Sequence, residues 1–227
     1  MSAASRTPIA ILAKVPRPGT VKTRLIPSLG ADKATRLYER CTTHTVKTAI
    51  EADVGPVELW CTPTILHPFF DGLVRQWHPV LRTQGNGNLG VRMLRTFEAL
   101  LMGHSQAIIV GSDCPSLTVE DFRNAAQVLS TGVNAAFVPT EDGGYALIGL
   151  RAVDPALFDQ VPWSTDAVMS VTRERLQDLD WTWKELPVRW DVDRPEDFQR
   201  LAADPRLGYL CDRIARPTPG RKLRAVS

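Results

Sequence analysis

The segment Ile9-Ala10-Ile11-Leu12-Ala13 is followed directly by Lys14-Val15-Pro16-Arg17-Pro18-Gly19-Thr20-Val21-Lys22-Thr23-Arg24-Leu25. The five apolar residues predict a buried first strand, and the prolines and glycine after them predict a fixed loop. This loop carries four cations and no carboxylate, namely Lys14, Arg17, Lys22 and Arg24. Because like charges repel, a polyanionic ligand such as a nucleotide would stabilise such a loop. A basic loop that is merely solvated is the alternative.

Apolar, strand-like runs alternate with amphipathic stretches along most of the chain. We expect further strands at 57–61, 80–83, 107–111, 135–139, 145–150 and 182–189, and helices at 31–50, 68–77, 89–101, 118–129, 165–179 and from 195. Thr118-Val119-Glu120-Asp121 fits a capping box at the start of one helix. The alternation predicts a three-layer α/β/α sandwich with a mainly parallel sheet. Two closely spaced strands on either side of Gly143-Gly144 would add an antiparallel piece and make the sheet mixed.

The composition is that of an ordinary globular protein of 227 residues, with 44% hydrophobic residues and a net charge of +2. This near-neutral charge argues against a dedicated nucleic-acid binder. Basic residues concentrate near the C-terminus, so we predict a single domain over residues 1–204 and a flexible basic tail over residues 205–227. No apolar run is long enough to span a membrane, and the N-terminus lacks the features of a signal peptide.

The four cysteines are widely spaced and include no C-x-x-C pair; they are Cys41, Cys61, Cys114 and Cys211. This spacing gives no support to a zinc site or a disulfide framework. We therefore predict reduced thiols and a cytoplasmic protein.

Two loops place aspartates at the predicted carboxyl ends of strands. Asp113 follows the strongly apolar run at 107–111, and Asp191 and Asp193 follow the last predicted strand. Ligands of open α/β sheets gather at this edge, and carboxylate oxygens suit Mg²⁺ or Mn²⁺ bridging to phosphates. We predict Asp113 and Asp193 as metal ligands, with Asp191 as a further ligand or a neighbour that orients one. The alternative for Asp113 is a cap of the turn before the next helix, although Thr118 already fills that role.

A glycine-rich segment, Gly85-Asn86-Gly87-Asn88-Leu89-Gly90, matches the pattern G-x-G-x-x-G between a strand and a helix. It follows the third strand instead of the first, and no isolated acidic residue ends a strand about 20 residues later, which argues against a nicotinamide cofactor. We instead predict that Gly85, Gly87, Asn88 and Gly90 approach the base or sugar of a nucleotide.

The turn Glu141-Asp142-Gly143-Gly144-Tyr145 joins the two closely spaced strands. It would place Asp142 or Tyr145 near an acceptor molecule. An ordinary hairpin turn is an equally good interpretation of the Asp-Gly pair.

Four segments stand in order along residues 8–201: Lys14-x-Pro16-x-Pro18-Gly19-x-x-Lys22-Thr23-Arg24-Leu25, Gly111-Ser112-Asp113-Cys114-Pro115, Glu141-Asp142-Gly143-Gly144-Tyr145 and Asp191-Val192-Asp193-x-Pro195-Glu196-Asp197. Together they resemble the DUF2064 family, bacterial transferases similar to the phospholactate guanylyltransferase and molybdenum-cofactor guanylyltransferase families. The resemblance implies a GT-A fold, the nucleotide-diphospho-sugar transferase architecture. It also implies that the first loop holds nucleotide phosphates, that Asp113 binds a divalent metal and that Asp193 supplies a second ligand; the loop residues concerned are Lys14, Pro18, Gly19, Lys22 and Arg24.

These residues lead us to expect a metal-dependent nucleotidyltransferase, in which an acceptor phosphate attacks the α-phosphorus of a nucleoside triphosphate and releases pyrophosphate. Lys14, Lys22 and Arg24 would neutralise the triphosphate, and Mg²⁺ or Mn²⁺ would lie between the aspartates and the phosphates. One alternative is a glycosyltransferase that uses a nucleotide-diphospho sugar, with Asp142 as a candidate base. Another is a non-catalytic nucleotide-binding protein. The expected partners are a nucleoside triphosphate or nucleotide sugar and a small acceptor, with neither nucleic acid nor membrane; the oligomeric state is left open.

Overall fold

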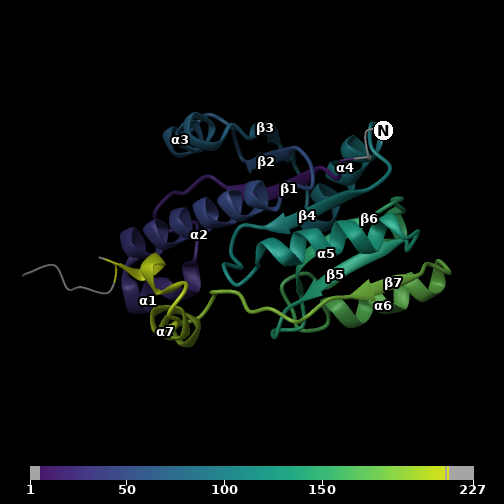
Figure 1. Cartoon of the computed structure of the whole chain (residues 1–227). Coiled ribbons are helices and arrows are strands. Elements are labelled where there is room, and N and C mark those ends of the chain that lie inside the picture. The colour runs from purple at the N-terminus through teal and green to yellow at the C-terminus, as the bar shows by residue number, and fades with distance from the viewer. Residues whose placement is uncertain (1–5, 213, 215–227) are drawn as a thin grey trace, which may run out of the picture.

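A seven-stranded sheet in the order β3-β2-β1-β4-β6-β5-β7 runs through the centre of the computed structural model, which describes residues 6–212 and 214 (Figure 1). The strands are β1 (Ile9–Lys14), β2 (Val57–Thr62), β3 (Val80–Thr83), β4 (Ala107–Gly111), β5 (Ala135–Pro139), β6 (Tyr145–Leu150) and β7 (Trp183–Glu185). Neighbouring strands are parallel, except that β6 is antiparallel to both β4 and β5. The predicted mainly parallel mixed sheet is confirmed, including its antiparallel pair.

The helices connect the strands as the apolar periodicity predicts. They are α1 (Ile26–Leu29), α2 (Ala31–Ala52), α3 (Pro68–Trp77), α4 (Leu89–Leu101), α5 (Val119–Ser130), α6 (Val168–Asp178) and α7 (Pro195–Ala203), with short 3-10 turns η1 (Thr23–Leu25), η2 (Pro155–Leu157) and η3 (Gly208–Cys211). The predicted capping box of α5 is present, because Thr118 and Asp121 each accept a hydrogen bond from the other's backbone N–H. Within the described part of the chain, no helix combines the length and apolar character needed to cross a membrane.

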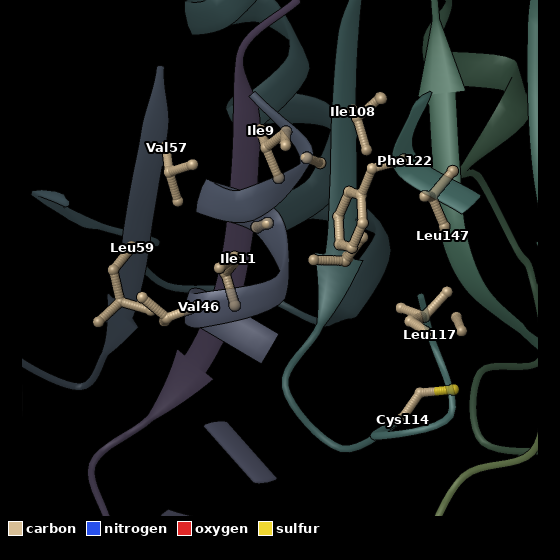
Figure 2. Packing of buried hydrophobic residues seen from close by; sticks show 14 of the residues in the cluster. Ile9, Ile11, Val46, Val57, Leu59, Ile108, Cys114, Leu117, Phe122 and Leu147 are labelled. Carbon is tan, nitrogen blue, oxygen red and sulfur yellow. The ribbon is translucent and has the colours of Figure 1, made fainter. Parts of the chain in front are cut away.

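Side chains alternate between the two faces of the sheet and build a hydrophobic layer on each. Ile9 and Ile11 of β1 pack against α2 and α5, where they meet Val46 and Phe122 (Figure 2). Ala10 points to the other face and lies in a second cluster with residues of α4 and α6. These two layers of helices, one on each face, confirm the predicted α/β/α sandwich.

The last strand is shorter than the predicted one at 182–189. Only Trp183–Glu185 pairs with β5, and one isolated bridge joins Arg189 to Thr140. Pro187 lacks a backbone N–H, so the ladder cannot continue through it. The chain then leaves the sheet and passes the loop after β4, where Val192 donates a backbone hydrogen bond to the carbonyl of Asp113. This path carries the late aspartates toward the early one.

The segment after α7 packs against the beginning of the chain. Leu207, Leu210 and Cys211 are buried in one cluster with Leu25 and Leu37 of η1 and α2. Burial of these apolar side chains stabilises the segment by the hydrophobic effect. The prediction of a flexible tail from residue 205 therefore does not hold for residues 207–211. Of the predicted tail, residues 213 and 215–227 lie outside the described residues.

Candidate functional site

A cleft of about 620 Å³ opens at the carboxyl edge of the sheet. Because β1, β4 and β5 run in the same direction, the loops that follow them meet at this edge. The cleft is lined by residues predicted from four separate segments, namely Lys14, Lys22, Arg24, Asp113, Asp142, Asp191 and Asp193. The tertiary fold thus brings together three of the four loop cations and all four of the aspartates singled out in the sequence.

Lys22 lies between two of these aspartates. Its Nζ is 3.2 Å from Oδ1 of Asp193 and 3.7 Å from Oδ2 of Asp113. The Lys22 side chain is 2% exposed, whereas those of Asp113 and Asp193 are 45% and 34% exposed. Burial alone would lower the pKa of Lys22, but attraction to Asp113 and Asp193 outweighs it and raises the pKa above its ordinary value. Lys22 is therefore a charged, internal partner that holds the two carboxylates near each other.

The backbone of Lys22 adopts an unusual conformation at this buried position. Its φ of 47° and ψ of 41° lie in the left-handed region, which is unfavourable for a residue with a side chain. Lys22 also stands directly before η1 as its N-cap, and its carbonyl accepts a hydrogen bond from the N–H of Leu25. Arg24 then places Nη1 3.4 Å from Oδ2 of Asp193 and remains exposed to the cleft. Of the other predicted loop contacts, Lys14 lines the cleft, whereas Pro18 and Gly19 do not.

Tyr38 of α2 joins the first two loops of the cleft and was not identified from the sequence. Its hydroxyl accepts hydrogen bonds from the Lys14 backbone N–H and the Ser112 hydroxyl, at 2.6 and 3.1 Å. Burial raises the pKa of this phenol above its ordinary value. In the sequence, Tyr38 is one aromatic residue on an amphipathic helix, which is the usual pattern of a core residue.

Gln84 and Arg92 also line the cleft, and neither was predicted from the sequence. The Gln84 amide is 2% exposed and donates to the carbonyls of Ala13 and Trp60, at 3.0 and 2.7 Å. Its oxygen accepts a 3.4 Å hydrogen bond from Nη1 of Arg92. Gln84 therefore fixes the ends of β1 and β2, and Arg92 adds a fourth cation to the cleft wall.

The glycine-rich segment does not contact the cleft in the way the sequence predicts. Gly85, Gly87, Asn88 and Gly90 are not among the lining residues. Gly85 and Gly87 adopt φ values of 72° and 120°, and Asn88 caps α4 by accepting a hydrogen bond from the Val91 N–H. A Cβ on Gly90 would lie 2.7 Å from a backbone oxygen. These four residues shape the turn into α4, while the flanking Gln84 and Arg92 face the cleft.

Asp142 and Tyr145 of the β5–β6 turn have different surroundings. One oxygen of Asp142 accepts hydrogen bonds from the Thr140 hydroxyl and the Gly144 N–H, and the side chain stays exposed at the cleft. The Tyr145 ring packs edge-on against Phe137, and burial raises the pKa of its hydroxyl. Both residues line the cleft, and Asp142 is the more exposed of the two.

Asp191 completes a group of four carboxylates. Its pKa is raised to about 7 by burial and then by repulsion from Asp113, Asp142 and Asp193, with a smaller opposing effect of Lys22. Among the described residues, no three His, Cys, Asp or Glu side chains are arranged as a ready-made metal site. The donor set nevertheless suits a hard divalent cation, because all four groups offer carboxylate oxygens, the ligands that Mg²⁺ and Mn²⁺ prefer. Since Lys22 occupies the buried side, a cation would meet these carboxylates on their exposed side.

Known structures share this fold. A protein from Desulfovibrio desulfuricans G20, provisionally assigned as a nucleotide-diphospho-sugar transferase, matches with a TM-score of 0.78 and 28% identity over 88% of this chain and 87% of that chain. CMP:2-keto-3-deoxy-manno-octonic acid synthetase complexed with CTP matches with a TM-score of 0.54 and 14% identity over 88% and 98%. Glucosyl-3-phosphoglycerate synthase from Mycobacterium tuberculosis, in complex with Mn²⁺, UDP and glucosyl-3-phosphoglycerate, matches with a TM-score of 0.51 and 12% identity. This match covers 95% of this chain and 82% of that chain. These likenesses confirm the GT-A type of fold.

Sequence comparison identifies the family more directly. None of the curated proteins matches the chain. The profile of a family described as "uncharacterized protein conserved in bacteria (DUF2064)" matches residues 45–165, which is more than half of the 227 residues. The chain therefore belongs to the DUF2064 family.

Proposed function

We propose that this protein is a nucleotidyltransferase that depends on a divalent metal ion and transfers a nucleoside monophosphate from a nucleoside triphosphate to a small acceptor. The observation that carries the proposal is the convergence of loop cations and aspartates at one edge of the sheet. A volume of about 620 Å³ lies within the range of small-molecule sites. Nucleotide phosphates and a divalent ion together would balance both kinds of charge.

The donor would lie with its phosphates along the first loop. Lys14 and Arg24 are exposed cations that can contact phosphate oxygens, and Arg92 offers a third at the far end of the cleft. Lys22 has a different part, because both of its carboxylate partners engage it on the buried side. It would position the aspartates instead of contacting the donor.

Asp113 and Asp193 would hold Mg²⁺ or Mn²⁺, since both carboxylates remain partly exposed at the cleft. When bound, such an ion would stabilise negative charge on the phosphate oxygens. Lys22 and Arg24 fix the orientation of Asp193, one cation near each of its oxygens. This preorganisation would avoid a costly rearrangement of the aspartates during the reaction.

The relatives support the class of reaction. The D. desulfuricans protein is provisionally assigned to transferases that use nucleotide sugars, and two proteins of the same fold are known with CTP and with Mn²⁺ and UDP. A nucleotide donor and a divalent metal are therefore consistent with what this fold accommodates. Fold likeness alone does not choose between nucleotidyl and glycosyl transfer.

Glycosyl transfer is the second candidate, favoured by the exposed carboxylate of Asp142. With one oxygen held by Thr140 and Gly144, its other oxygen can accept a proton from an attacking sugar hydroxyl. The two candidates differ in their products, which are pyrophosphate for nucleotidyl transfer and a nucleoside diphosphate for glycosyl transfer.

The test measures the melting temperature of the full chain with a panel of nucleoside triphosphates and nucleotide sugars, each with Mg²⁺ and with a chelator. We expect one triphosphate to raise the melting temperature only when metal is present, because ligands that bind the native state stabilise it. The same mixture should release pyrophosphate once an acceptor is supplied. A rise with a nucleotide sugar alone would establish the second candidate, and metal-independent binding without turnover would indicate a non-catalytic protein.

The matched variants are Asp113→Ala in the cleft and Asp178→Ala on the exposed surface of α6. Asp113→Ala should lose the metal-dependent rise and slow turnover by about 10²-fold or more, as loss of a charge-stabilising group commonly does. Asp178→Ala should behave as the parent protein, because the Asp178 side chain is 71% exposed and its ion pair with Arg175 is long, at 3.9 Å. Unchanged turnover in a folded Asp113→Ala protein would refute the proposal.

A further inference from the structure

A second cavity, of about 510 Å³, adjoins the cleft. The two cavities share four lining residues, namely Arg24, Asp142, Asp191 and Asp193. The rest of the second cavity is formed by the β5–β6 turn, the loop before α6, the segment between β7 and α7, and the start of α7. The residues concerned are Glu141, Gly143, Asp166, Trp190, Arg194 and Asp197. A molecule in this cavity would face a donor in the cleft across the shared aspartates.

The two cavities differ in charge. The cleft is lined by four cations and four aspartates, whereas the second cavity has six carboxylates and only two arginines. Glu141 is paired with Arg200 outside the lining, at 2.6 and 3.0 Å, and Asp193 is paired with Lys22 and Arg24. Asp166 is exposed, and the hydrogen bonds that Asp142 accepts from described residues come from the neutral Thr140 hydroxyl and Gly144 N–H. Asp191, with its pKa raised to about 7, is only partly charged at neutral pH, and Arg194 offsets one further carboxylate. An excess of negative charge remains, carried by Asp142, Asp166 and Asp197.

Trp190 holds a fixed position at the second cavity. Its backbone N–H and carbonyl both bond to the Ser116 hydroxyl, at 3.0 and 2.6 Å. The guanidinium of Arg200 lies 4.4 Å from the ring centroid, and the pair with Glu141 holds that guanidinium in place. With the Trp190 ring occupied by Arg200 and by the apolar cluster around Leu25, the carboxylates decide what the second cavity binds. Because carboxylates only accept hydrogen bonds, they suit a ligand with several hydrogen-bond donors.

We propose that the second cavity is the acceptor subsite, and that it takes a polyhydroxylated acceptor that is uncharged or carries an amino group, not a phosphate ester. The inference rests on the proposed function, because it places the acceptor relative to a donor in the cleft. Hydroxyl and ammonium groups can donate to Asp142 and Asp166, whereas a phosphate ester would add negative charge where carboxylates are already in excess. The sequence analysis expects an acceptor phosphate as the attacking group. The charge of the second cavity instead favours an acceptor hydroxyl in that role.

In the proposed reaction the acceptor hydroxyl is the nucleophile and pyrophosphate is the leaving group. The acceptor hydroxyl oxygen forms a bond to the α-phosphorus, and the bond from that phosphorus to the bridging oxygen of pyrophosphate breaks. The hydroxyl proton passes to the carboxylate of Asp142 and from there to solvent, and pyrophosphate leaves with the bonding electrons. Asp142 is placed for this because it lines both cavities.

The test compares the binding of glucosamine, glucose and glucose 6-phosphate to the full chain by calorimetry, without and with the triphosphate. We expect glucosamine to bind at least about tenfold more tightly than glucose 6-phosphate, which corresponds to about 1.4 kcal/mol. Asp166→Lys should remove or reverse this preference, because it changes the charge of the second cavity without touching the cleft. Asp159→Lys, an exposed substitution outside both cavities, should retain it.

The absence of a preference in the parent protein, whether the three sugars bind equally or not at all, would overturn the inference. The same preference in Asp166→Lys would also overturn it. The rise in melting temperature with triphosphate, measured in the same samples without sugar, reports separately on the proposed function. If the parent protein shows the sugar preference but no rise in melting temperature with triphosphate, nucleotidyl transfer is refuted. The charge selectivity of the second cavity then still holds.

Discussion

The ammonium of Lys22 lies 3.2 Å from the carboxylate of Asp193, a residue 171 positions later in the chain. This contact joins the first loop of the protein to the last one. The nearby Asp113 makes it a three-way junction, because its carboxylate is 3.7 Å from the same ammonium. The position of both proposed metal ligands thus depends on one buried lysine.

Lys22→Met should destabilise the protein by about 2 kcal/mol in urea denaturation. Leaving a buried ion pair without one partner costs about 3–5 kcal/mol, and the partial exposure of Asp113 and Asp193 reduces that cost. Because the pKa of Lys22 is raised in the folded state, its contribution is fully present below the unfolded pKa of about 10.4 and is lost only as the pH rises through the folded value. The loss should therefore be the same at pH 8 and pH 9.

The control for this variant is Lys47→Met, which removes an exposed contact within α2 to Glu51. An exposed pair of this kind contributes about 0.5 kcal/mol or less. Equal urea midpoints for Lys22→Met and Lys47→Met would contradict the assigned role of Lys22.

Arg189→Met should cost about 3 kcal/mol of unfolding free energy. Arg189 binds Asp121 through two hydrogen bonds of 2.8 Å, and the Asp121 side chain is only 2% exposed. Removing the guanidinium would leave a buried carboxylate with only its capping partners. Arg6→Met breaks an exposed pair with Asp53 and should change the stability by less than about 1 kcal/mol. A loss for Arg189→Met as small as that for Arg6→Met would show that the Asp121 pair is not structural.

Gly90→Ala and Gly72→Ala should change the stability in opposite directions, although both glycines lie in helices. A Cβ at Gly90 would approach the carbonyl of Phe158 and the indole nitrogen of Trp163 to 2.7 and 2.9 Å. Such overpacking commonly costs about 1–3 kcal/mol. At Gly72 of α3 a Cβ meets no atom within 4 Å, and alanine should add about 0.5–1 kcal/mol through helix propensity. Thermal unfolding of both variants checks this, and a stabilised Gly90→Ala protein would contradict the packing described here.

The four thiols should react with a disulfide reagent only after unfolding. All are buried and free, and burial raises the pKa of Cys41, Cys61 and Cys114 to about 12 and that of Cys211 to about 11. At pH 8 almost no thiolate is present, and the thiolate is the reactive form. Absorbance should report four thiols per chain in guanidinium chloride and almost none in buffer. Rapid titration of two or more thiols in the native protein would disprove this burial.

Local patterns predicted most of the elements, because local interactions dominate at those positions. The apolar run at 107–111 lies buried as β4, and Thr118 with Asp121 caps α5 as expected. The strand at 182–189 was overextended, since Pro187 outweighs the β propensity of its neighbours. The predicted tail begins too early, because Leu207 shares its apolar cluster with Leu25 and Leu37, which lie more than 150 residues away in the sequence.

The candidate site divides in the same way. The aspartates and cations were visible as unusual residues at the ends of predicted strands, and the cleft collects them. Tyr38 and Gln84 were not visible, because their side chains bind backbone groups that no local pattern associates with them. The glycine-rich pattern is ambiguous for the opposite reason: a short motif can form a turn into a helix as readily as it can approach a ligand, and the turn is what the structure shows.

The sequence by itself determined the order of strands and helices, the three-layer fold and the residues from which a charged site is built. These follow from periodicity, turn residues and charge, which are properties of neighbouring residues. Only the tertiary structure decided that Lys22 is buried between Asp113 and Asp193, and that negative charge gathers in the second cavity beyond the cleft. Burial and electrostatic interaction depend on distance in space, and the chain reaches those distances only when the ends of its strands meet at one edge of the sheet.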